Sequence, residues 1–305
     1  MPAAAAPVEA EVDGRRIKLT HLDKVLYEAD GFTKAQMLDY YSRISEFMLP
    51  HLREHAVTLK RYPHGAGGEF FFEKACPDYR PPWMKTVMRH AESSDRDIDY
   101  CVVDDRASLI WLANQSTIEF HVPMALRRSM ERPRALVFDL DPGPGVDAAK
   151  CAEVALALRE LLAVDDLRAW PKSSGSKGIH VYVPLNRPRM TFERTKEYAH
   201  AVADRLAEER ADVTAQMRKA SRGGKVFIDW SQNSTHKTTV CPYSLRARER
   251  PTVSAPLAWS EVEAAAGGAG TDALLHTTDD VLERVAASGD LFAAVLSTEQ
   301  SLPRR

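Results

Sequence analysis

Two aspartates one residue apart, Asp139 and Asp141, carry the strongest chemical signal in the sequence. They end an apolar segment that has the composition of a buried strand, and alternate side chains of a strand share a face. Both carboxylates therefore point to one side, while Leu136, Phe138 and Leu140 point to the other side and can pack into a core. Two neighbouring carboxylates repel each other, so the pKa of one should rise unless a cation neutralises them. Mg²⁺ or Mn²⁺ would do so, because hard cations prefer oxygen ligands.

The aspartate pair alone is also consistent with three other interpretations. It could be an ordinary polar turn before Pro142 and Gly143. An aspartyl phosphatase uses the pattern V-F-D-L-D-G-T, but here Pro142 replaces the glycine, no threonine follows, and the motif lies in the middle of the chain. A glycosyltransferase uses a similar pair to hold a nucleotide-sugar diphosphate through a metal.

A third acid, Asp229, ends the apolar segment 226–228. Viewed alone, it fits a strand-end acid paired with a nearby lysine or arginine. If its strand lies beside that of Asp139, three carboxylates converge, which is enough for a two-metal site. One metal would lower the pKa of a primer 3′-hydroxyl, and the other would hold a nucleoside triphosphate and stabilise the leaving pyrophosphate. We therefore expect Asp139, Asp141 and Asp229 to be catalytic and to bind two Mn²⁺ or Mg²⁺ ions.

The segment 173–180, Ser-Ser-Gly-Ser-Lys-Gly-Ile-His, favours a phosphate site. Its two glycines allow a tight turn and a close approach to a ligand, and exposed backbone N–H groups in such a turn form an anion nest. Ser174, Lys177 and His180 would add a hydroxyl, a positive charge and an imidazole. The pattern is not a P-loop, which requires G-x-x-x-x-G-K-[ST] at the start of a helix. A plain polar hairpin turn is the alternative.

Two further residues, Arg246 and His121, have weaker individual signals. Arg246 could clamp phosphate oxygens with two guanidinium N–H groups, although alone it fits an ordinary surface arginine. His121 alone fits a hydrogen-bonded histidine of the core.

Basic and aromatic residues near the N-terminus suggest contacts with nucleic acid. Lys24, Lys34, Lys60 and Arg61 are candidate contacts to DNA phosphates. The segment Phe70–Phe72 places aromatic rings on both faces of a strand, so we expect at least one ring in the core, and an exposed ring could stack on a base. Net charge is −2 and gives no hint of a partner. Residues 167–250, however, hold 17 Lys/Arg against 8 Asp/Glu, and residues 251–305 hold 3 against 8. This asymmetry permits phosphate binding on one face, although chance clustering would explain it equally.

The elements around these residues alternate without a strict βαβ repeat, which predicts a mixed α+β fold. A helix should begin at Thr33, which has capping-box spacing to Gln36, and end at Pro50. Other helices are expected over Ala107–Ile118 with Asp105 as cap, from Asp147 to Leu162, and over Thr191–Glu209. Strands are expected over Val57–Tyr62, Phe70–Lys74, Thr86–His90, Ile98–Val103, Ala135–Leu140, Leu167–Lys172 and Ile179–Pro184. Lys225–Trp230 and Thr238–Tyr243 should form a hairpin pair, and Ser260–Leu296 short helices and loops.

The four cysteines, Cys76, Cys101, Cys151 and Cys241, are far apart in the sequence, so neither a zinc site nor a disulfide framework is expected. Each should be a small buried apolar residue in a reducing cytoplasm. No run of about 18 apolar residues occurs, so we expect no membrane span. Residues 1–16 are expected to be a flexible tail and residues 297–305 a second tail.

With these motifs assembled, the sequence closely resembles the polymerase domain of bacterial ligase D, in the archaeo-eukaryotic primase superfamily. The resemblance covers about Ile17 to Leu296. It is carried by Phe138-Asp139-Leu140-Asp141-Pro142-Gly143, Ser174-Gly175-Ser176-Lys177-Gly178-Ile179-His180, Phe227-Ile228-Asp229-Trp230-Ser231-Gln232-Asn233, Pro242-Tyr243-Ser244-Leu245-Arg246, Leu19-Thr20, Asp23-Lys24-Val25-Leu26-Tyr27 and Phe71-Phe72-Glu73-Lys74.

This resemblance implies a primase-like core of mixed or antiparallel sheet flanked by helices. A DNA-binding portion would span about 17–130, the catalytic core about 131–250 and a helical portion about 251–296. The three aspartates would bind metals. His121, Ser174, Lys177, His180 and Arg246 would hold the NTP or dNTP, with His121 or Ser174 near the sugar 2′-hydroxyl. Lys24 and Lys34 would bind the 5′-phosphate of a gap or broken end, Phe71 and Phe72 would stack on the template, and Lys219, Arg222 and Lys225 would lie near the primer terminus.

One departure bears on the substrate. Ligase D members often carry an arginine just after the position of His90 that helps to pair two broken ends, whereas here Ala91 and Glu92 follow and Asp95 and Asp97 make the loop acidic. We therefore expect end-bridging to be weak. No ligase or nuclease module follows in the sequence given, which suggests a stand-alone gap-filling relative or a polymerase domain excised from a longer ligase; the sequence start and the short C-terminal tail favour the stand-alone form.

The function expected is template-directed extension of a primer 3′-hydroxyl at short gaps or broken ends, with a preference for ribonucleotides. The alternative is a non-catalytic module that binds 5′-phosphate DNA ends and recruits a ligase. A separate ligase or end-binding protein is an expected partner, and we expect a cytoplasmic, nucleoid-associated monomer.

Overall fold

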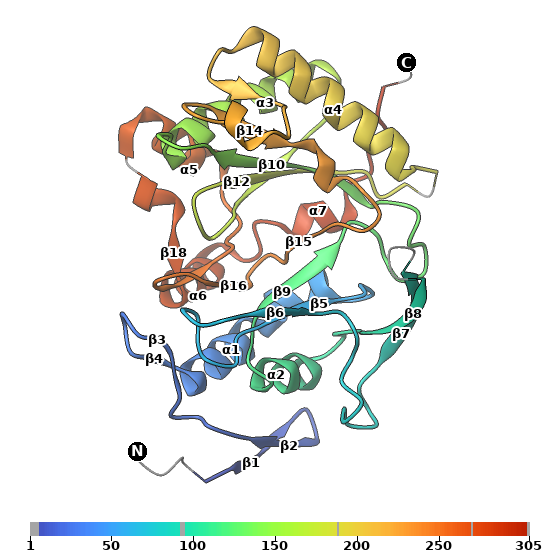
Figure 1. Ribbon diagram of the computed structural model, residues 1–305, viewed down its shortest axis with the longest axis vertical. Helices are drawn as coiled ribbons and strands as arrows, with labels where there is room; N and C mark the ends of the chain where they lie inside the picture. The colour runs from blue at the N-terminus through green and yellow to red at the C-terminus, as the bar shows by residue number, and fades with distance from the viewer. Residues whose placement is uncertain (1–5, 92–94, 188, 270, 304–305) are drawn as a thin grey trace.

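The computed structural model describes residues 6–91, 95–187, 189–269 and 271–303, and it is built around two sheets (Figure 1). The larger sheet has the strand order β11 (Trp170–Ser173), β12 (Ile179–Pro184), β10 (Ala135–Pro142), β14 (Val226–Asp229) and β13 (Val213–Thr214). Its strands pair antiparallel except for β13 and β14, which are parallel. The mixed sheet confirms the expected α+β class.

Two helices, α3 (Ala148–Val164) and α4 (Phe192–Glu209), cover one face of this sheet in the upper part of Figure 1. Leu136, Phe138 and Leu140 of β10 are fully buried in the core that these helices complete. Asp147 and Thr191 cap the two helices, since each side chain accepts a hydrogen bond from a backbone N–H of the first turn. The alternation of β10 thus buries its apolar face and leaves the face of Asp139 and Asp141 free of helices.

The smaller sheet has the strand order β15 (Thr238–Val240), β9 (Thr117–Pro123), β5 (Thr58–Arg61) and β6 (Phe71–Glu73). One of its faces packs on α1 (Lys34–Leu52) and α2 (Arg106–Asn114), where Leu59 and Phe120 join a core with Tyr41 and Ile44. The predicted capping box of Thr33 and Gln36 is present at α1, and Asp105 caps α2 as expected.

Smaller elements surround these two sheets. They are the hairpins β1 (Val8–Val12)–β2 (Arg15–Leu19), β3 (Val25–Tyr27)–β4 (Phe32–Thr33) and β7 (Thr86–Ala91)–β8 (Arg96–Cys101), a sheet of β16 (Leu245–Ala247), β17 (Pro251–Val253) and β18 (His276–Thr277), and the helices α5 (Trp259–Ala264), α6 (Thr278–Ser288) and α7 (Ala293–Ser297). None of the helices in the described ranges is long and apolar enough to cross a membrane.

Several sequence expectations about these elements are wrong. The segments Lys225–Trp230 and Thr238–Tyr243 do not form a hairpin, because β14 pairs with β10 and β15 pairs with β9 in the other sheet. The helix expected over Ala107–Ile118 ends at Asn114, and Thr117 already begins β9. Pro50 does not end α1, which continues to Leu52; a proline this close to a helix end removes one hydrogen bond and breaks little.

The two expected tails are also largely ordered. Residues 8–16 form most of the β1–β2 hairpin, and its turn residues Asp13 and Gly14 both have positive φ, +51° and +75°. Two positive φ values are what a tight two-residue hairpin turn requires. At the other end, Gln300 is buried and its side chain hydrogen-bonds Arg168 and Pro184, while Leu302 is 7% exposed.

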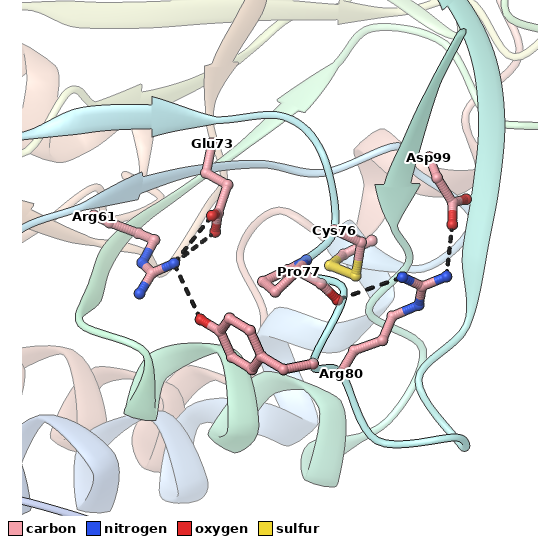
Figure 2. Close-up of a disulfide and its surroundings, with 8 residues drawn as sticks. Arg61, Glu73, Cys76, Pro77, Arg80 and Asp99 are labelled. Atoms are coloured by element: carbon pink, nitrogen blue, oxygen red, sulfur yellow. Dashed lines mark hydrogen bonds and ion pairs between the residues drawn. A yellow bond between two sulfur atoms is a disulfide. The ribbon is translucent and has the colours of Figure 1, made fainter.

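A disulfide joins Cys76 and Cys101, contrary to the expectation of four free thiols (Figure 2). The residues lie 25 positions apart, but the loop before β7 runs beside β8, where the Cys76 N–H donates to the Asp99 carbonyl at 2.6 Å, and the two Cα atoms are 4.9 Å apart. Ion pairs between Arg61 and Glu73 and between Arg80 and Asp99 flank the bond. Cys151 and Cys241 are free and buried, as expected.

Candidate active site

The register of the larger sheet places acidic and basic residues in one row across four strands. Asp139 of β10 lies directly opposite His180 of β12 on one side and Asp229 of β14 on the other, and Lys172 of β11 lies opposite His180. Directly opposed residues of antiparallel strands point to the same face. Asp141, two residues along β10, shares this face. The sheet therefore brings together all three aspartates that the sequence singled out.

Asp139 sits at the centre of this row. Its Oδ1 lies 3.2 Å from Nε2 of His180, and the Asp139 side chain is only 14% exposed. This Oδ1 is buried without an aligned hydrogen bond, and so is Nδ1 of His180. Burial alone would raise the pKa of Asp139, but the charges of His180 and Lys172 outweigh it and lower the pKa. An unsatisfied buried carboxylate oxygen is a feature that a bound cation would explain.

Asp141 is more open to solvent than Asp139. Desolvation by the surrounding protein, followed by repulsion from Asp139 and Asp229, raises the pKa of Asp141 to about 7. This is the increase expected for clustered carboxylates that no cation neutralises.

Asp229 is 8% exposed, and its carboxylate accepts hydrogen bonds from within its own turn. Oδ1 accepts from the backbone N–H and the hydroxyl of Ser231, at 3.0 and 2.6 Å, and Oδ2 accepts from the side-chain amide of Gln232 at 3.2 Å. In the described part of the chain, no three His, Cys, Asp or Glu side chains are arranged as a completed metal site. Metal binding by the three aspartates therefore stays a prediction.

A cleft of about 540 Å³ opens in front of this row. Asp139 and Asp141 line it together with all five predicted nucleotide contacts, which are His121, Ser174, Lys177, His180 and Arg246. These residues come from both sheets and from β16, so the cleft lies where the two sheets face each other. The sequence did not single out Gln232, Arg248 or Thr239, which also line it.

The turn between β11 and β12 is shaped by close packing. A Cβ atom on Gly178 would lie 2.4 Å from the backbone oxygen of Leu140, and one on Gly175 would lie 2.5 Å from Cγ of Arg246. The backbone N–H groups of Ser176 and Gly178 donate to the Ser174 hydroxyl at 3.3 and 3.1 Å. The backbone N–H groups expected to form an anion nest therefore donate largely within the turn itself. Lys177 is an exposed cation at the cleft, as is Arg248.

Lys172 is a site residue that the sequence did not reveal. Its side chain is fully buried, and Nζ donates to the Ser254 hydroxyl at 2.6 Å. Burial, followed by repulsion from Arg246, lowers the pKa of Lys172 to about 7. From the sequence alone, Lys172 is an ordinary strand residue. Only the register shows that it lies opposite His180, which in turn lies opposite Asp139.

Two of the proposed DNA-binding cations, Lys24 and Lys34, lie close together, and the Lys34 backbone N–H donates to the Lys24 carbonyl at 2.8 Å. Lys24 Nζ donates to the carbonyl of Pro63, and Lys34 Nζ donates to the carbonyl of Thr20 at 2.7 Å. Lys34 is only 3% exposed. Burial, followed by repulsion from Lys24, lowers the pKa of Lys34 to about 8. A bound phosphate would relieve this repulsion, which favours the predicted anion site.

Lys60 and Arg61 are not free for phosphates, because each is paired within the protein. Lys60 Nζ lies 3.5 Å from Glu119, and one guanidinium N–H group of Arg61 donates to both carboxylate oxygens of Glu73 at 3.0 Å (Figure 2). Direct DNA contacts by these two residues would require the pairs to open.

The three phenylalanines are all exposed, at 51%, 44% and 54% for Phe70, Phe71 and Phe72, so the expectation that one is in the core is wrong. Phe72 packs edge-on against His121, and Lys60 lies 4.0 Å from the ring centroid of Phe70. Because strand side chains alternate, Phe71 projects to the opposite face, where Arg61 lies over it. Phe70 and Phe72 are thus the rings that share a face with the cleft residues.

The loop of Lys219, Arg222 and Lys225 contributes one residue to the cleft. Arg222 lines the cleft, with its guanidinium 3.5 Å from the ring centroid of Phe227. The loop packs on Gly143, where a Cβ atom would lie 1.7 Å from the Arg222 backbone oxygen. Lys219 is exposed and Lys225 is half-buried, and neither lines the cleft.

The chain is similar to known proteins over most of its length. It matches the family described as LigD, primase-polymerase domain, over residues 33–292. It is 42% identical over 292 residues to the multifunctional non-homologous end joining DNA repair protein LigD of Mycobacterium tuberculosis (strain ATCC 25618 / H37Rv), covering 91% of this chain and 37% of that protein. It is 34% identical over 289 residues to the bifunctional non-homologous end joining protein LigD of Bacillus subtilis (strain 168), covering 94% of this chain and 45% of that protein.

A solved structure gives the same result. The polymerase domain from Mycobacterium tuberculosis ligase D in complex with DNA aligns with a TM-score of 0.84 and 40% identity, over 93% of this chain and 99% of that one. The chain spans less than half the length of the curated relatives it matches. The match confirms the resemblance stated from the motifs and the mixed α+β fold. The chain belongs to the LigD primase-polymerase domain family.

Proposed function

We propose that this protein is a template-directed nucleotidyltransferase that extends a primer 3′-hydroxyl at short gaps or broken DNA ends. The observation that carries the proposal is the direct cross-strand pairing of Asp229 with Asp139, which lines the cleft together with Asp141. Lys177 and Arg246 line the same cleft and supply cations for a triphosphate. Family membership supports the reaction class.

The three carboxylates fit divalent cations. Oδ1 of Asp139 is buried without an aligned hydrogen bond, and the raised pKa of Asp141 indicates clustered negative charge that a cation would neutralise. Asp139, Asp141 and Asp229 would hold two Mn²⁺ or Mg²⁺ ions, which supply Lewis-acid activation of the hydroxyl and stabilise the pyrophosphate charge. Asp229 must then exchange some of its hydrogen bonds to Ser231 and Gln232 for metal contacts.

The other cleft residues bind and orient the nucleotide. Lys177 and Arg246 would hold the triphosphate oxygens, with Arg246 able to offer two parallel N–H groups. His180, 3.2 Å from Asp139, holds that carboxylate in place. The Ser174 hydroxyl is occupied within its turn, so His121 is the better candidate for the sugar 2′-hydroxyl and for a preference for ribonucleotides.

The DNA would lie across the smaller sheet and the N-terminal portion. Lys24 and Lys34 would bind a 5′-phosphate, and Phe72 would stack on template bases. Phe71, the other ring predicted for stacking, projects to the opposite face, where Arg61 lies over it. Lys219, Arg222 and Lys225 would lie near the primer terminus. The position after His90 lacks the arginine that end-bridging relatives carry; Glu92 lies outside the described residues, and His90 is paired with Asp95 and Asp97. We therefore favour gap filling over the bridging of two ends, with a ligase or end-binding protein as partner.

Primer extension tests this proposal most simply. The substrates are duplexes with a short gap, with and without a 5′-phosphate, offered NTPs or dNTPs with Mn²⁺ or Mg²⁺. The expected result is templated extension that the 5′-phosphate enhances, and no extension by Asp139→Ala, which should bind DNA normally. Binding that depends on the 5′-phosphate without any incorporation by the wild type would instead show a non-catalytic end-binding module.

A further inference from the structure

Glu119 on β9 is a buried carboxylate that neither the motifs nor the proposed chemistry uses. Its side chain is 1% exposed and lies on the cleft-facing side of the smaller sheet. Lys60 of β5 is its direct cross-strand neighbour, and Phe72 of β6 continues the same row. A charged side chain this deeply buried is costly unless its partners compensate it.

The two carboxylate oxygens of Glu119 contact different partners. Oε1 accepts hydrogen bonds from the Tyr62 hydroxyl at 3.0 Å and from the backbone N–H of Ala247 at 3.1 Å. Oε2 lies 2.9 Å from Nε2 of His121 and 3.5 Å from Nε of Arg246. One carboxylate thus fixes two of the cleft residues and the strand β16 that carries Arg246.

This arrangement determines the tautomer of His121. Burial lowers the pKa of His121 from its ordinary value despite the nearby carboxylate, which favours the neutral ring. A neutral imidazole carries one proton, and a carboxylate can only accept. The proton is therefore on Nε2, facing Glu119, and Nδ1 is left as a hydrogen-bond acceptor. Among the sugar and phosphate groups of a nucleotide, the donors that such an acceptor suits are the sugar hydroxyls.

We propose that Glu119 is the positioning residue of the nucleotide site, which holds His121 as a hydrogen-bond acceptor toward the sugar and holds Arg246 in place for the triphosphate. The inference rests on the proposed nucleotidyltransferase function. It adds a residue that touches no substrate and acts through two residues that do.

Glu119→Gln is the most informative variant. Tyr62 and Ala247 both donate, so the amide oxygen must take the Oε1 position and the amide NH₂ must face His121. The imidazole then has to present a lone pair at Nε2 and move its proton to Nδ1. The substitution nearly preserves shape while reversing the tautomer, which a purely structural role for Glu119 would not predict.

The test combines spectroscopy and kinetics on the whole chain. Long-range ¹H–¹⁵N correlation spectra of histidine-labelled protein, with the His121 signals identified by their loss in His121→Asn, should show Nε2 protonated in the wild type and Nδ1 protonated in Glu119→Gln. In primer extension, the KM for NTP should rise roughly 10-fold or more, the effect of one lost charge-assisted contact, while kcat changes less than about 3-fold. Glu119→Asp keeps the charge but is too short to reach both sets of partners, so its KM should rise as well.

Glu261→Gln is the control, because Glu261 is likewise a carboxylate paired with an arginine, Arg284, although it is only half-buried and lies away from the cleft. Its kinetics should equal those of the wild type. A wild-type KM in Glu119→Asp, or Nδ1 protonation in the wild type, would overturn the positioning role. The spectra need no activity, so this failure is distinct from a wild type that incorporates no nucleotide, which would refute the proposed function instead.

Discussion

Gly175→Ala should show how closely the turn between β11 and β12 is fitted against Arg246. Gly175 has a φ of +66°, a conformation that costs an alanine about 1–2 kcal/mol. The new Cβ would also lie 2.5 Å from Cγ of Arg246 and 2.7 and 2.8 Å from backbone atoms of Val253 and Ser254. Because two of these three neighbours are backbone, the contact cannot be relieved by rotating a side chain alone. Overpacking of this kind costs roughly 1–3 kcal/mol, so we expect a total loss of stability of about 2–5 kcal/mol.

The same substitution should weaken catalysis, because the turn or Arg246 has to move. Loss of one charge-assisted hydrogen bond to the triphosphate costs about 1.5–3 kcal/mol, or roughly 10- to 100-fold in kcat/KM for the nucleotide. Chemical denaturation measures the first effect, and single-nucleotide incorporation at varied NTP concentration measures the second. Gly267→Ala is the control, since its Cβ would meet no atom within 4 Å. A Gly175→Ala protein with wild-type stability and kcat/KM would refute the proposed fit.

Two other substitutions test the phosphate site at Lys34 and the contribution of the disulfide to stability. The pKa of Lys34 is lowered to about 8 in the folded protein, so the unfolded chain binds more protons above that pH, and the stability of the wild type should rise relative to Lys34→Met between about pH 8 and 10. The part of the DNA affinity that depends on the 5′-phosphate should be lost in Lys34→Met. In the wild type it should fall as pH rises through about 8, because Lys34 loses its charge. An affinity that does not change with pH would contradict the phosphate site. Cys76→Ser removes a cross-link between residues 25 positions apart, and loop-closure entropy then predicts a loss of about 3–4 kcal/mol in urea unfolding. Equal unfolding midpoints for wild type and variant under oxidising conditions would show that the bond does not form.

The acidic part of the site was predictable because strand alternation is a local property. The spacing of Leu136, Phe138 and Leu140 against Asp139 and Asp141 fixes which face is buried, and the structure confirms it. The pairing of β14 with β10 has no such local signal, and the sequence pattern favours a hairpin with Thr238–Tyr243 that the structure does not contain. Short strands carry little information about their neighbours, since pairing depends on contacts far apart in the sequence.

Other features depended on geometry that no local pattern reports. Lys172 looks like an ordinary strand residue until the register places it opposite His180. Glu119 is two residues from His121 on β9, but its burial and its contacts with Tyr62, Ala247 and Arg246 come from segments far apart in the sequence. The disulfide depends on the loop before β7 lying beside β8, where the Cys76 N–H donates to the Asp99 carbonyl. The N-terminal hairpin, in contrast, has a local signal in Asp13-Gly14, a dipeptide typical of tight hairpin turns.

Asp229→Asn tests the central claim most directly, because Asp229 is joined to the aspartate pair only by the register of the sheet. The amide is nearly the same size as the carboxylate and can still accept a hydrogen bond from Ser231, so the fold should be retained. Single-turnover incorporation of one nucleotide on a gapped duplex should fall by roughly 1,000-fold or more, with DNA affinity unchanged, because a buried electrostatic contact in the transition state is lost. Asp212→Asn, which alters an ion pair with Arg210 at the edge of the same sheet, should incorporate normally. Incorporation by Asp229→Asn at the wild-type rate would contradict a catalytic centre built on the paired strands β10 and β14.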